Sequence, residues 1–319
     1  MAYYDVFNGD ADGICALIQL RLAEPRDSVL VTGVKRDIAL LQQVQACKGD
    51  VVTVLDIALE KNSAALQTVL AAGASVLYCD HHFPGELPTH PCLTTLINTG
   101  AEVCTSLLVS AYLRHAHAHW AVVGAFGDNL HSSAAALARS IDLEPALLEP
   151  YERLGICINY NAYGASLTDL HFTPQDLFQR LLRYQTPAAF LQADTGTFAA
   201  LEAGYHDDLA MTVQATRLLE TEAAAVILLP DAPWARRVSG IFGNLLVNQA
   251  PKRAHAVVTE RAGQGYLVSV RAPLQNRTGA DAVCRQFPGG GGRAGAAGIN
   301  DLPVAQLDTF IDVFQRHYR

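Results

Sequence analysis

Short apolar runs alternate with amphipathic stretches along the first part of the chain. Four of the runs have the length and the β-branched character of strands, and they cover Tyr3–Asn8, Val29–Val34, Val51–Asp56 and Val76–Asp80. A fifth run, Trp120–Phe126, fits a buried strand or a buried helix equally well. Helical patterns fill the intervals. This alternation predicts a doubly wound parallel sheet with helices on both faces.

The pattern changes twice further along the chain. From about Ala134 to Glu220 it is mostly helical, with breaks at Asn159–Gly164, Pro174 and Pro187. Strand character returns at Ala225–Leu229, Ala254–Thr259 and Gly265–Arg271, with a helix over Ala235–Val247. We therefore predict an α/β protein in three parts: a sheet domain over residues 1–140, a helical connector over 141–221 and a smaller C-terminal α/β domain over 222–319.

Acidic side chains end or follow the apolar runs of the first part. They are Asp10, Asp12, Asp56, Asp80 and Asp128. Because the carboxyl ends of parallel strands line one crevice of an open sheet, we expect these side chains to converge. Neighbouring carboxylates require cations, and hard ions such as Mg or Mn accept their oxygens, while the imidazole of His81 favours Mn or another transition metal. A single Asp at a strand end could instead cap the following helix, but the whole set predicts a metal centre.

Composition narrows the classes of partner. Half of the residues are hydrophobic and the formal net charge is -8. An acidic protein is poorly suited to track a long nucleic-acid polymer, although a small anionic substrate can still bind locally. The polar, acidic start is unlike a signal peptide, and no apolar run reaches the ~18 residues of a membrane span. Seven cysteines without framework spacing are typical of free thiols in a reducing compartment. We expect a cytoplasmic protein with no membrane partner.

The order and spacing of four motifs resemble those of the DHH phosphoesterases. The motifs are Phe7–Gly13, Leu55-Asp56, Asp80-His81-His82 and Gly127-Asp128. The glycine-rich segment Phe287–Gly298, preceded by Ser269-Val270-Arg271, resembles the DHH-associated C-terminal domain. The resemblance implies that residues 1–140 form a DHH phosphoesterase domain and residues 222–319 a substrate-binding domain.

The resemblance also implies roles for individual residues. Asp12, Asp56, His81 and Asp128 would bind one ion, and Asp56 would bridge to a second ion held by Asp10, so that one or two Mn (or Mg) ions bind per chain. Asp80 would orient the histidines, and His82 would face the scissile phosphate. The implied substrate-binding residues are Asn98, Arg271, Gly290, Gly291, Gly292 and Arg293. Glycines allow backbone N–H groups to approach a phosphate closely, although a glycine cluster alone is more typical of a flexible loop. Arg271 and Asn98 taken alone would be a surface arginine and a turn residue.

Three positions depart from the family pattern. Val6 stands where many two-metal members have a histidine, and Asn8 stands where RecJ-like members have a carboxylate. An amide oxygen can bind a hard ion but lacks the charge that holds it firmly. Asn8 would therefore complete the second site weakly, or a single ion would bind until substrate supplies phosphate oxygens. Arg293 replaces the usual histidine and favours bidentate contact with a terminal phosphate.

We expect hydrolysis of short oligonucleotides, dinucleotides or a related small nucleotide to mononucleotides, by metal-activated water in a cleft between the two domains. A single-strand-specific exonuclease is the second hypothesis, but it would need a basic groove with stacking aromatics, which the sequence does not indicate. The third hypothesis, a nucleotide-binding sensor with weak or lost catalysis, follows from Val6, Asn8 and Arg293. No local motif selects DNA or RNA, and the oligomeric state stays open.

Overall fold

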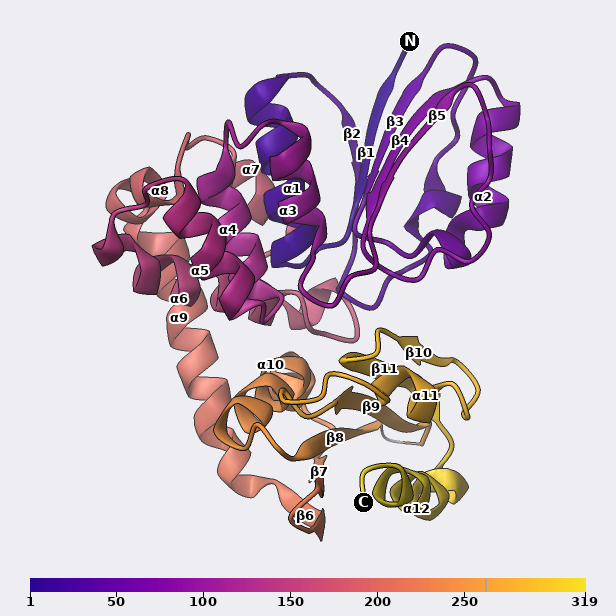
Figure 1. Ribbon diagram of the computed structural model, residues 1–319, viewed down its shortest axis with the longest axis vertical. Helices are drawn as coiled ribbons and strands as arrows, with labels where there is room; N and C mark the ends of the chain where they lie inside the picture. Colours follow the sequence, from indigo (N-terminus) through magenta and orange to yellow (C-terminus); the bar gives the residue numbers. More distant parts are fainter. Residues whose placement is uncertain (262) are drawn as a thin grey trace. The chain divides into compact units, whose positions relative to one another are not determined.

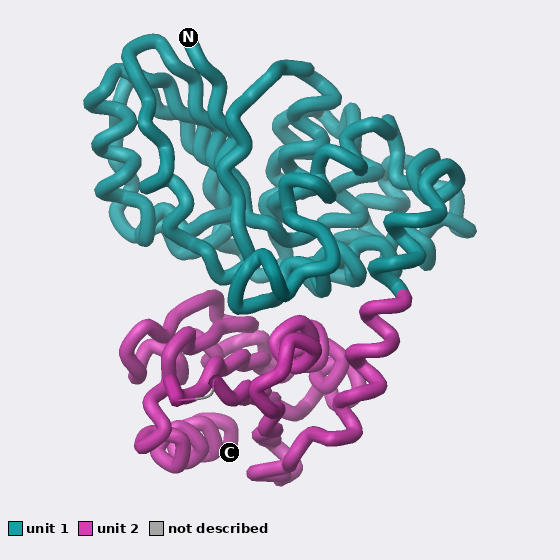
Figure 2. The backbone as a smooth tube through the Cα atoms, turned by 180° about the vertical axis from the view of Figure 1, so that it is seen from behind, with its two compact units in different colours: residues 1–202 teal, residues 203–319 magenta. Residues whose placement is uncertain are grey.

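The chain folds into two compact units. The structure, a computed structural model, describes residues 1–261 and 263–319, and the units are Met1–Glu202 and Ala203–Arg319 (Figure 2). Unit 1 contains an all-parallel sheet followed by helices, and unit 2 contains a smaller mixed sheet. The predicted fold class is confirmed, while the domain boundaries near residues 140 and 221 stay predictions.

A five-stranded parallel sheet forms the centre of unit 1 (Figure 1), in the order β2-β1-β3-β4-β5. The strands are β1 (Tyr3–Phe7), β2 (Val29–Val31), β3 (Val51–Leu55), β4 (Ser75–Asp80) and β5 (Leu93–Ile97). The central strands are buried on both faces and are therefore mostly apolar, with the buried Asp5 of β1 and Thr53 of β3 among the exceptions. This apolar character explains why the sequence predicts them. β5 was not predicted, because this edge strand exposes Thr94 and Thr95.

β2 is shorter than the predicted Val29–Val34. A turn ends it early, because the backbone N–H of Val34 donates to Asp37 Oδ2 at 3.1 Å instead of to a neighbouring strand. The turn directs the following residue, Lys35, toward the carboxyl edge of the sheet, where its ammonium group meets Asp10.

Helices cover both faces of the sheet, as predicted (Figure 1). On one side lie α1 (Ala11–Ala23), α3 (Thr105–Tyr112) and α4 (Ala118–Gly127), and on the other lies α2 (Leu59–Ala71). The run Trp120–Phe126, which the sequence left open, is part of α4. This helix is apolar around its whole circumference, because it packs among α1, α3, α5 (His131–Ser140) and α6 (Leu148–Asn161).

The predicted helical region begins within α5 and includes α6. It contains α7 (Pro174–Leu181), α8 (Pro187–Ala193) and α9 (Thr195–Ala210), with short 3-10 turns between some of the helices. Pro174 and Pro187, predicted as breaks, are the first residues of their helices. The N–H that proline lacks would have no partner within the helix at this position. Thr173 and Thr186 cap these helices by accepting from Asp176 N at 3.1 Å and Ala189 N at 3.2 Å.

Unit 2 contains a six-stranded mixed sheet in the order β10-β11-β9-β8-β7-β6. The strands are β6 (Thr216–Glu220), β7 (Ala224–Leu229), β8 (Ala254–Arg261), β9 (Gly265–Arg271), β10 (Gly290–Gly292) and β11 (Ala296–Leu302), and the helices are α10 (Pro233–Gln249), α11 (Ala280–Cys284) and α12 (Leu307–His317). β7, β8, β9 and α10 confirm the predicted elements. The helical prediction for Thr216–Glu220 was wrong, because this largely exposed edge strand carries no strong apolar pattern. β10 and β11 were missed, since glycine is poor in strands.

Among the described residues, none of the helices has both the length and the apolar character of a membrane-spanning segment.

Candidate metal centre

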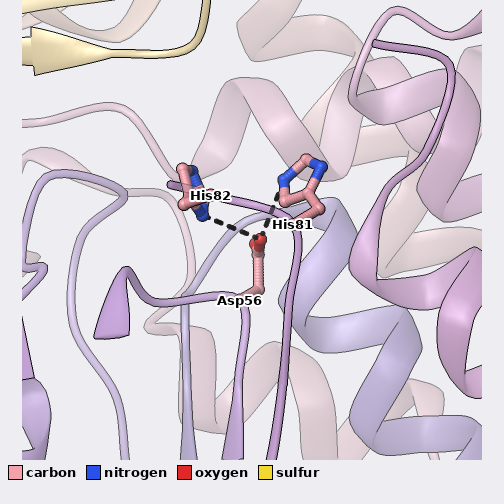
Figure 3. A group of neighbouring side chains, drawn as sticks. All are labelled: Asp56, His81 and His82. Atoms are coloured by element: carbon pink, nitrogen blue, oxygen red, sulfur yellow. Dashed lines mark ion pairs between the residues drawn. The ribbon is translucent and has the colours of Figure 1, made fainter. Parts of the chain in front are cut away.

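Acidic residues gather at the carboxyl edge of the parallel sheet in unit 1. Asp10 and Asp12 follow β1, Asp56 follows β3, and Asp80 is the last residue of β4. Asp128 does not come from a strand end, as the sequence argument assumed, but is the residue that follows α4. Ligand atoms of Asp12, His81 and Asp128 lie within 4.8 Å of one another. The same holds for Asp56, His81 and His82, whose rings flank the Asp56 carboxylate (Figure 3).

Asp12 is fixed by the N-terminus of a neighbouring helix. It lies in the first turn of α1, and its carboxylate accepts from the backbone N–H groups of Thr105 at 2.7 Å and Ser106 at 2.8 Å. These are the first residues of α3, whose own N-cap, Cys104, makes no side-chain cap. N–H groups at a helix N-terminus are unsatisfied within the helix and carry partial positive charge. They therefore hold the Asp12 side chain in place.

Asp10 caps its own helix, the alternative that the sequence left open for a single Asp, and it also takes part in the acidic cluster. Its Oδ1 accepts from the backbone N–H groups of Asp12 and Gly13, both at 3.0 Å. Its Oδ2 pairs with the Lys35 ammonium. Burial raises the pKa of Asp10, but the charge and hydrogen bond of Lys35, together with the backbone hydrogen bond from Gly13, outweigh burial and hold the pKa below its ordinary value.

Asp56 is the most strongly perturbed carboxylate of the cluster. Its backbone has φ +59°, a left-handed conformation that is strained for a residue with a side chain. Thr105 Oγ1 donates to its Oδ1 at 3.2 Å, and His81 Nε2 lies 3.3 Å from the same oxygen. Burial, followed by the charges of the surrounding carboxylates, raises the pKa of Asp56 well above its ordinary value. A carboxylate in this environment needs a nearby cation to stay ionised.

The tautomer of His81 follows from one hydrogen bond. Its Nδ1 lies 2.7 Å from the carbonyl oxygen of Val103, and because a carbonyl only accepts, Nδ1 carries the proton. The lone pair of neutral His81 is therefore on Nε2. This atom lies 3.3 Å from Asp56 Oδ1, 3.8 Å from Asp12 Oδ2 and 3.9 Å from Asp128 Oδ2. A ligating histidine is usually oriented in this way by a backbone carbonyl or a carboxylate.

His82 is oriented by Asp80. Its Nδ1 donates to Asp80 Oδ1 at 2.7 Å, and 29% of its side chain is exposed, whereas Asp80 is fully buried. Within the described part of the chain, Asp80 Oδ2 has no hydrogen-bond partner. Burial raises the pKa of Asp80, but the charge and hydrogen bond of His82 outweigh burial and keep the pKa below its ordinary value. The buried Asp80 carboxylate therefore fixes the orientation of the partly exposed His82 ring.

Lys35 is a residue of this edge that the sequence argument missed. Besides Asp10, its Nζ lies 3.0 Å from Asn159 Oδ1 and 4.0 Å from Asp128 Oδ1. Burial lowers the pKa of Lys35, but the neighbouring negative charges, Asp10 first, raise it above its ordinary value. A basic residue just after a predicted parallel strand was a usable signal. Asn159 was not predictable, because 124 residues separate it from Lys35.

Asn8 lies in the cluster, but its amide is engaged with the backbone. Its Oδ1 accepts from Asp10 N at 3.2 Å, and its Nδ2 donates to the carbonyl oxygen of Lys35 at 3.1 Å. A carboxylate could accept the first hydrogen bond but could not donate the second. The amide at this position therefore holds the segment that carries Lys35.

The predicted substrate-binding residues lie in two places. Asn98 follows β5 in unit 1, is exposed, and accepts from Gly100 N at 3.0 Å, as a turn residue does. The other five belong to unit 2. β11 lies between β9 and β10. Its Ala296 pairs with Arg271 of β9, and its Ala297 pairs with Gly292 of β10, so Arg271 and the glycines lie at the same end of the sheet.

The glycine segment is an edge strand with a tight turn and not a flexible loop. Gly290 N donates to Phe287 O at 3.0 Å and Arg293 N to Ala296 O at 2.8 Å. A Cβ at Gly290 would lie 1.9 Å from Cys284 O, so only glycine fits there. The Arg271 guanidinium is fixed nearby, with Nε donating to Asn244 Oδ1 at 2.5 Å.

The donor set of unit 1 fits a divalent cation. Asp12, Asp56 and Asp128 provide carboxylate oxygens and His81 provides a neutral imidazole nitrogen, a mixture suited to Mn and to other first-row ions. The pKa of Asp56 is raised, and Asp80 Oδ2 has no hydrogen-bond partner among the described residues. Both observations indicate more negative charge at this edge than its hydrogen bonds and Lys35 balance.

The fold and this centre define a class: α/β proteins with two units and a carboxylate–histidine centre at the sheet edge of the first. No protein-family model matches the chain, and no curated protein matches its sequence. Solved structures do match over nearly all of the chain, and they include DHH-domain proteins, so the fold that the motifs predict is confirmed.

Three of these structures show the extent of the similarity. A DHH-domain protein described as a member of a family of ribosomal proteins has a TM-score of 0.69 and 13% identity, covering 99% of this chain and 86% of its own. Exonuclease RecJ bound to manganese has a TM-score of 0.62 and 20% identity over 100% and 90% of the two chains. The pGpG-specific phosphodiesterase PggH from Vibrio cholerae has a TM-score of 0.55 and 14% identity over 99% and 98%.

Proposed function

We propose that the chain is a Mn- or Mg-dependent phosphoesterase that hydrolyses short oligonucleotides, dinucleotides or a related small nucleotide to mononucleotides. The observation that carries the proposal is the convergence of Asp12, Asp56, His81 and Asp128, with the His81 Nε2 lone pair within 3.9 Å of all three carboxylates. The fold supports it, because similar structures include a manganese-bound exonuclease and a phosphodiesterase of a dinucleotide.

The residues of the centre divide into two tasks. When bound, a divalent cation lowers the pKa of water and neutralises charge on phosphate oxygens, and the four residues above would hold it. His82 lies beside them with its Nδ1 proton on Asp80 and its ring partly exposed. Protonated His82 would transfer its Nε2 proton to the leaving oxygen and become neutral, and Asp80 would stabilise the imidazolium before the transfer and fix the ring through Nδ1.

Substrate recognition would use the fixed cations and donors of unit 2. Arg293 follows the glycine strand β10, and Arg271 ends β9 on the other side of β11, at the same end of the mixed sheet. A guanidinium binds phosphate through two parallel hydrogen bonds. Asn98 would add a polar contact at the sheet edge of unit 1. The net charge of -8 favours a small substrate over a polymer.

A nucleotide-binding sensor with weak or lost catalysis is the second candidate. Two observations favour it: Val6 is fully buried in the apolar core of the sheet and offers no ligand, and the Lys35 ammonium already engages Asp10. Both features reduce the capacity of the first motif to bind a second cation.

A substrate panel separates the two candidates. The purified chain is incubated with Mn and linear dinucleotides, cyclic dinucleotides, 3',5'-bisphosphonucleotides and longer single strands, and products are resolved by chromatography. We expect mononucleotides from the short substrates, and loss of turnover in His81→Ala and Asp128→Ala. Glu86→Gln, which changes an exposed carboxylate on the loop after His82, is the matched control. If no substrate is hydrolysed and both alanine variants still bind nucleotide, the sensor replaces the enzyme.

A further inference from the structure

The ammonium group of Lys35 is surrounded by oxygen atoms from three separate segments. It pairs with Asp10 Oδ2 at the start of α1, lies 3.0 Å from Asn159 Oδ1 on α6 and lies 4.0 Å from Asp128 Oδ1 after α4. Carboxylate and amide oxygens are also the ligands that a hard divalent cation takes. An ammonium group and a metal ion would therefore compete for the same place.

Asp128 lies between this place and the metal centre. Its Oδ1 faces Lys35 at 4.0 Å, and its Oδ2 faces His81 Nε2 at 3.9 Å. A divalent ion at the metal centre and the Lys35 ammonium would therefore place one cation on each side of Asp128. A further divalent ion bound to Asp10 would lie close to the ammonium group, where like charges in a partly buried site repel strongly.

Lys35 is held in position by contacts of its backbone as well as of its side chain. Its N–H donates to the carbonyl oxygen of Ala162 at 2.8 Å, and its own carbonyl accepts from Asn8 Nδ2 at 3.1 Å. Its Nζ also lies 5.5 Å from the centre of the Tyr163 ring, within the range of a cation–π interaction. The amide of Asn8 thus holds Lys35 through a hydrogen bond that a carboxylate at position 8 could not donate.

We propose that Lys35 is the second cation of the centre: its ammonium group takes the place that a second metal ion would occupy beside Asp10, so the chain binds one divalent ion. The inference rests on the proposed function, because it concerns the metal content of that same centre. Lys35 is a positioning residue in this account, since it balances Asp10 and Asp128 and so fixes the carboxylate shared with the single ion.

Counting bound Mn on the full-length chain tests the inference without an activity assay. Chelator-treated protein is titrated with Mn²⁺, and the free ion is followed by electron paramagnetic resonance. We expect one Mn per wild-type chain, two per chain in Lys35→Ala, and one in Lys35→Arg, which keeps the charge. Lys35→Met removes the charge but keeps most of the length of the side chain, and we expect it also to bind two.

The outcomes separate this inference from the proposed function. No Mn on the wild-type chain would contradict the proposed metal-dependent activity itself. Two Mn on the wild-type chain would overturn only the role of Lys35, as would a Lys35→Ala variant that still binds one. If Lys35→Ala does not fold, Lys35→Met decides: two ions support the role of Lys35 and one ion contradicts it.

Discussion

Asp80 shows how a single buried carboxylate can be assigned a task. Its Oδ1 accepts from His82 Nδ1 at 2.7 Å, while its Oδ2 has no partner among residues 1–261 and 263–319. Burying a carboxylate with one oxygen unsatisfied is costly. The arrangement makes sense if the charge of Asp80 is needed to hold His82 and to add negative potential at the metal centre.

Replacing Asp80 by asparagine tests that task. Asp80→Asn keeps the size of the side chain but removes its charge, so the His82 ring loses its anion. We expect kcat on the best substrate of the panel to fall by about 10- to 100-fold, the usual effect of changing a carboxylate that supports a site histidine. KM should change less. Steady-state kinetics check this, with Glu86→Gln as the control, and an Asp80→Asn kcat within twofold of wild type would contradict it.

The residues of this edge differ in how far the sequence predicts them. Asp12, Asp56, His81 and Asp128 each lie in a short motif, and the structure brings the four together. Lys35 carries no motif, and its partner Asn159 is far away in the sequence. Contacts of this kind arise from the packing of distant segments, so local patterns contain no signal for the pair.

The position of Asp128 depends on close packing between helices. A Cβ added at Gly127, the last residue of α4, would lie 2.3 Å from Ala11 Cβ on α1 and 2.9 Å from Gly155 O on α6. Both neighbours belong to helices that surround α4, so neither can move aside easily. Glycine at position 127 therefore sets the approach of α4, and with it the place of the carboxylate that follows.

We expect Gly127→Ala to lower the free energy of unfolding by about 1–3 kcal/mol, the usual cost of overpacking, and to weaken Mn binding. Gly196→Ala is the control, because Gly196 lies in α9 and no heavy atom of the described chain is within 4 Å of the added Cβ. It should not lower stability. Urea unfolding and Mn titration measure both effects. A Gly127→Ala midpoint equal to that of wild type would show that the packing is looser than the structure indicates.

Among the elements, the sequence predicts buried ones best. β1, β3 and β4 are mostly apolar because both of their faces are covered. The edge strands β5 and β6 were missed because exposed polar residues such as Thr94 and Thr216 interrupt their pattern. β10 was missed because Gly290–Gly292 has no side chains, and its strand conformation depends wholly on pairing with β11.

The two units should respond to different solution conditions, and unit 1 should respond to metal. An ion that binds only the folded state stabilises it, by about 2.7 kcal/mol when its concentration is 100 times Kd. We therefore expect Mn to raise the unfolding temperature of the wild-type chain. His81→Ala should lose most of this shift, because it removes the imidazole ligand. Calorimetry with and without Mn measures it, and an equal shift in both proteins would mean that Mn binds elsewhere.

Unit 2 should respond to pH through His255. Burial lowers the pKa of His255 from 6.5 to about 4, and within the described chain its Nδ1 has no hydrogen-bond partner. Between these two pKa values the unfolded chain binds a proton that the folded chain does not, so this contribution is complete above about pH 6.5 and is lost as the pH falls toward 4.

As the pH falls from 7 to 5, protonation of His255 in the unfolded chain should lower the free energy of unfolding by about 2 kcal/mol, at roughly 1.4 kcal/mol per pKa unit. His255→Gln should lose this part of the pH dependence, because glutamine does not titrate. Urea unfolding of both proteins at the two pH values measures the difference. Parallel pH dependences would contradict the assignment.

Anomalous scattering can locate the ion on the chain. Crystals of the full-length chain grown with Mn are measured at the Mn absorption edge, where anomalous scattering marks the ion. We expect one strong peak within bonding distance of Asp12, Asp56, His81 and Asp128. A crystal saturated with Mn that shows no peak among these four residues would contradict it.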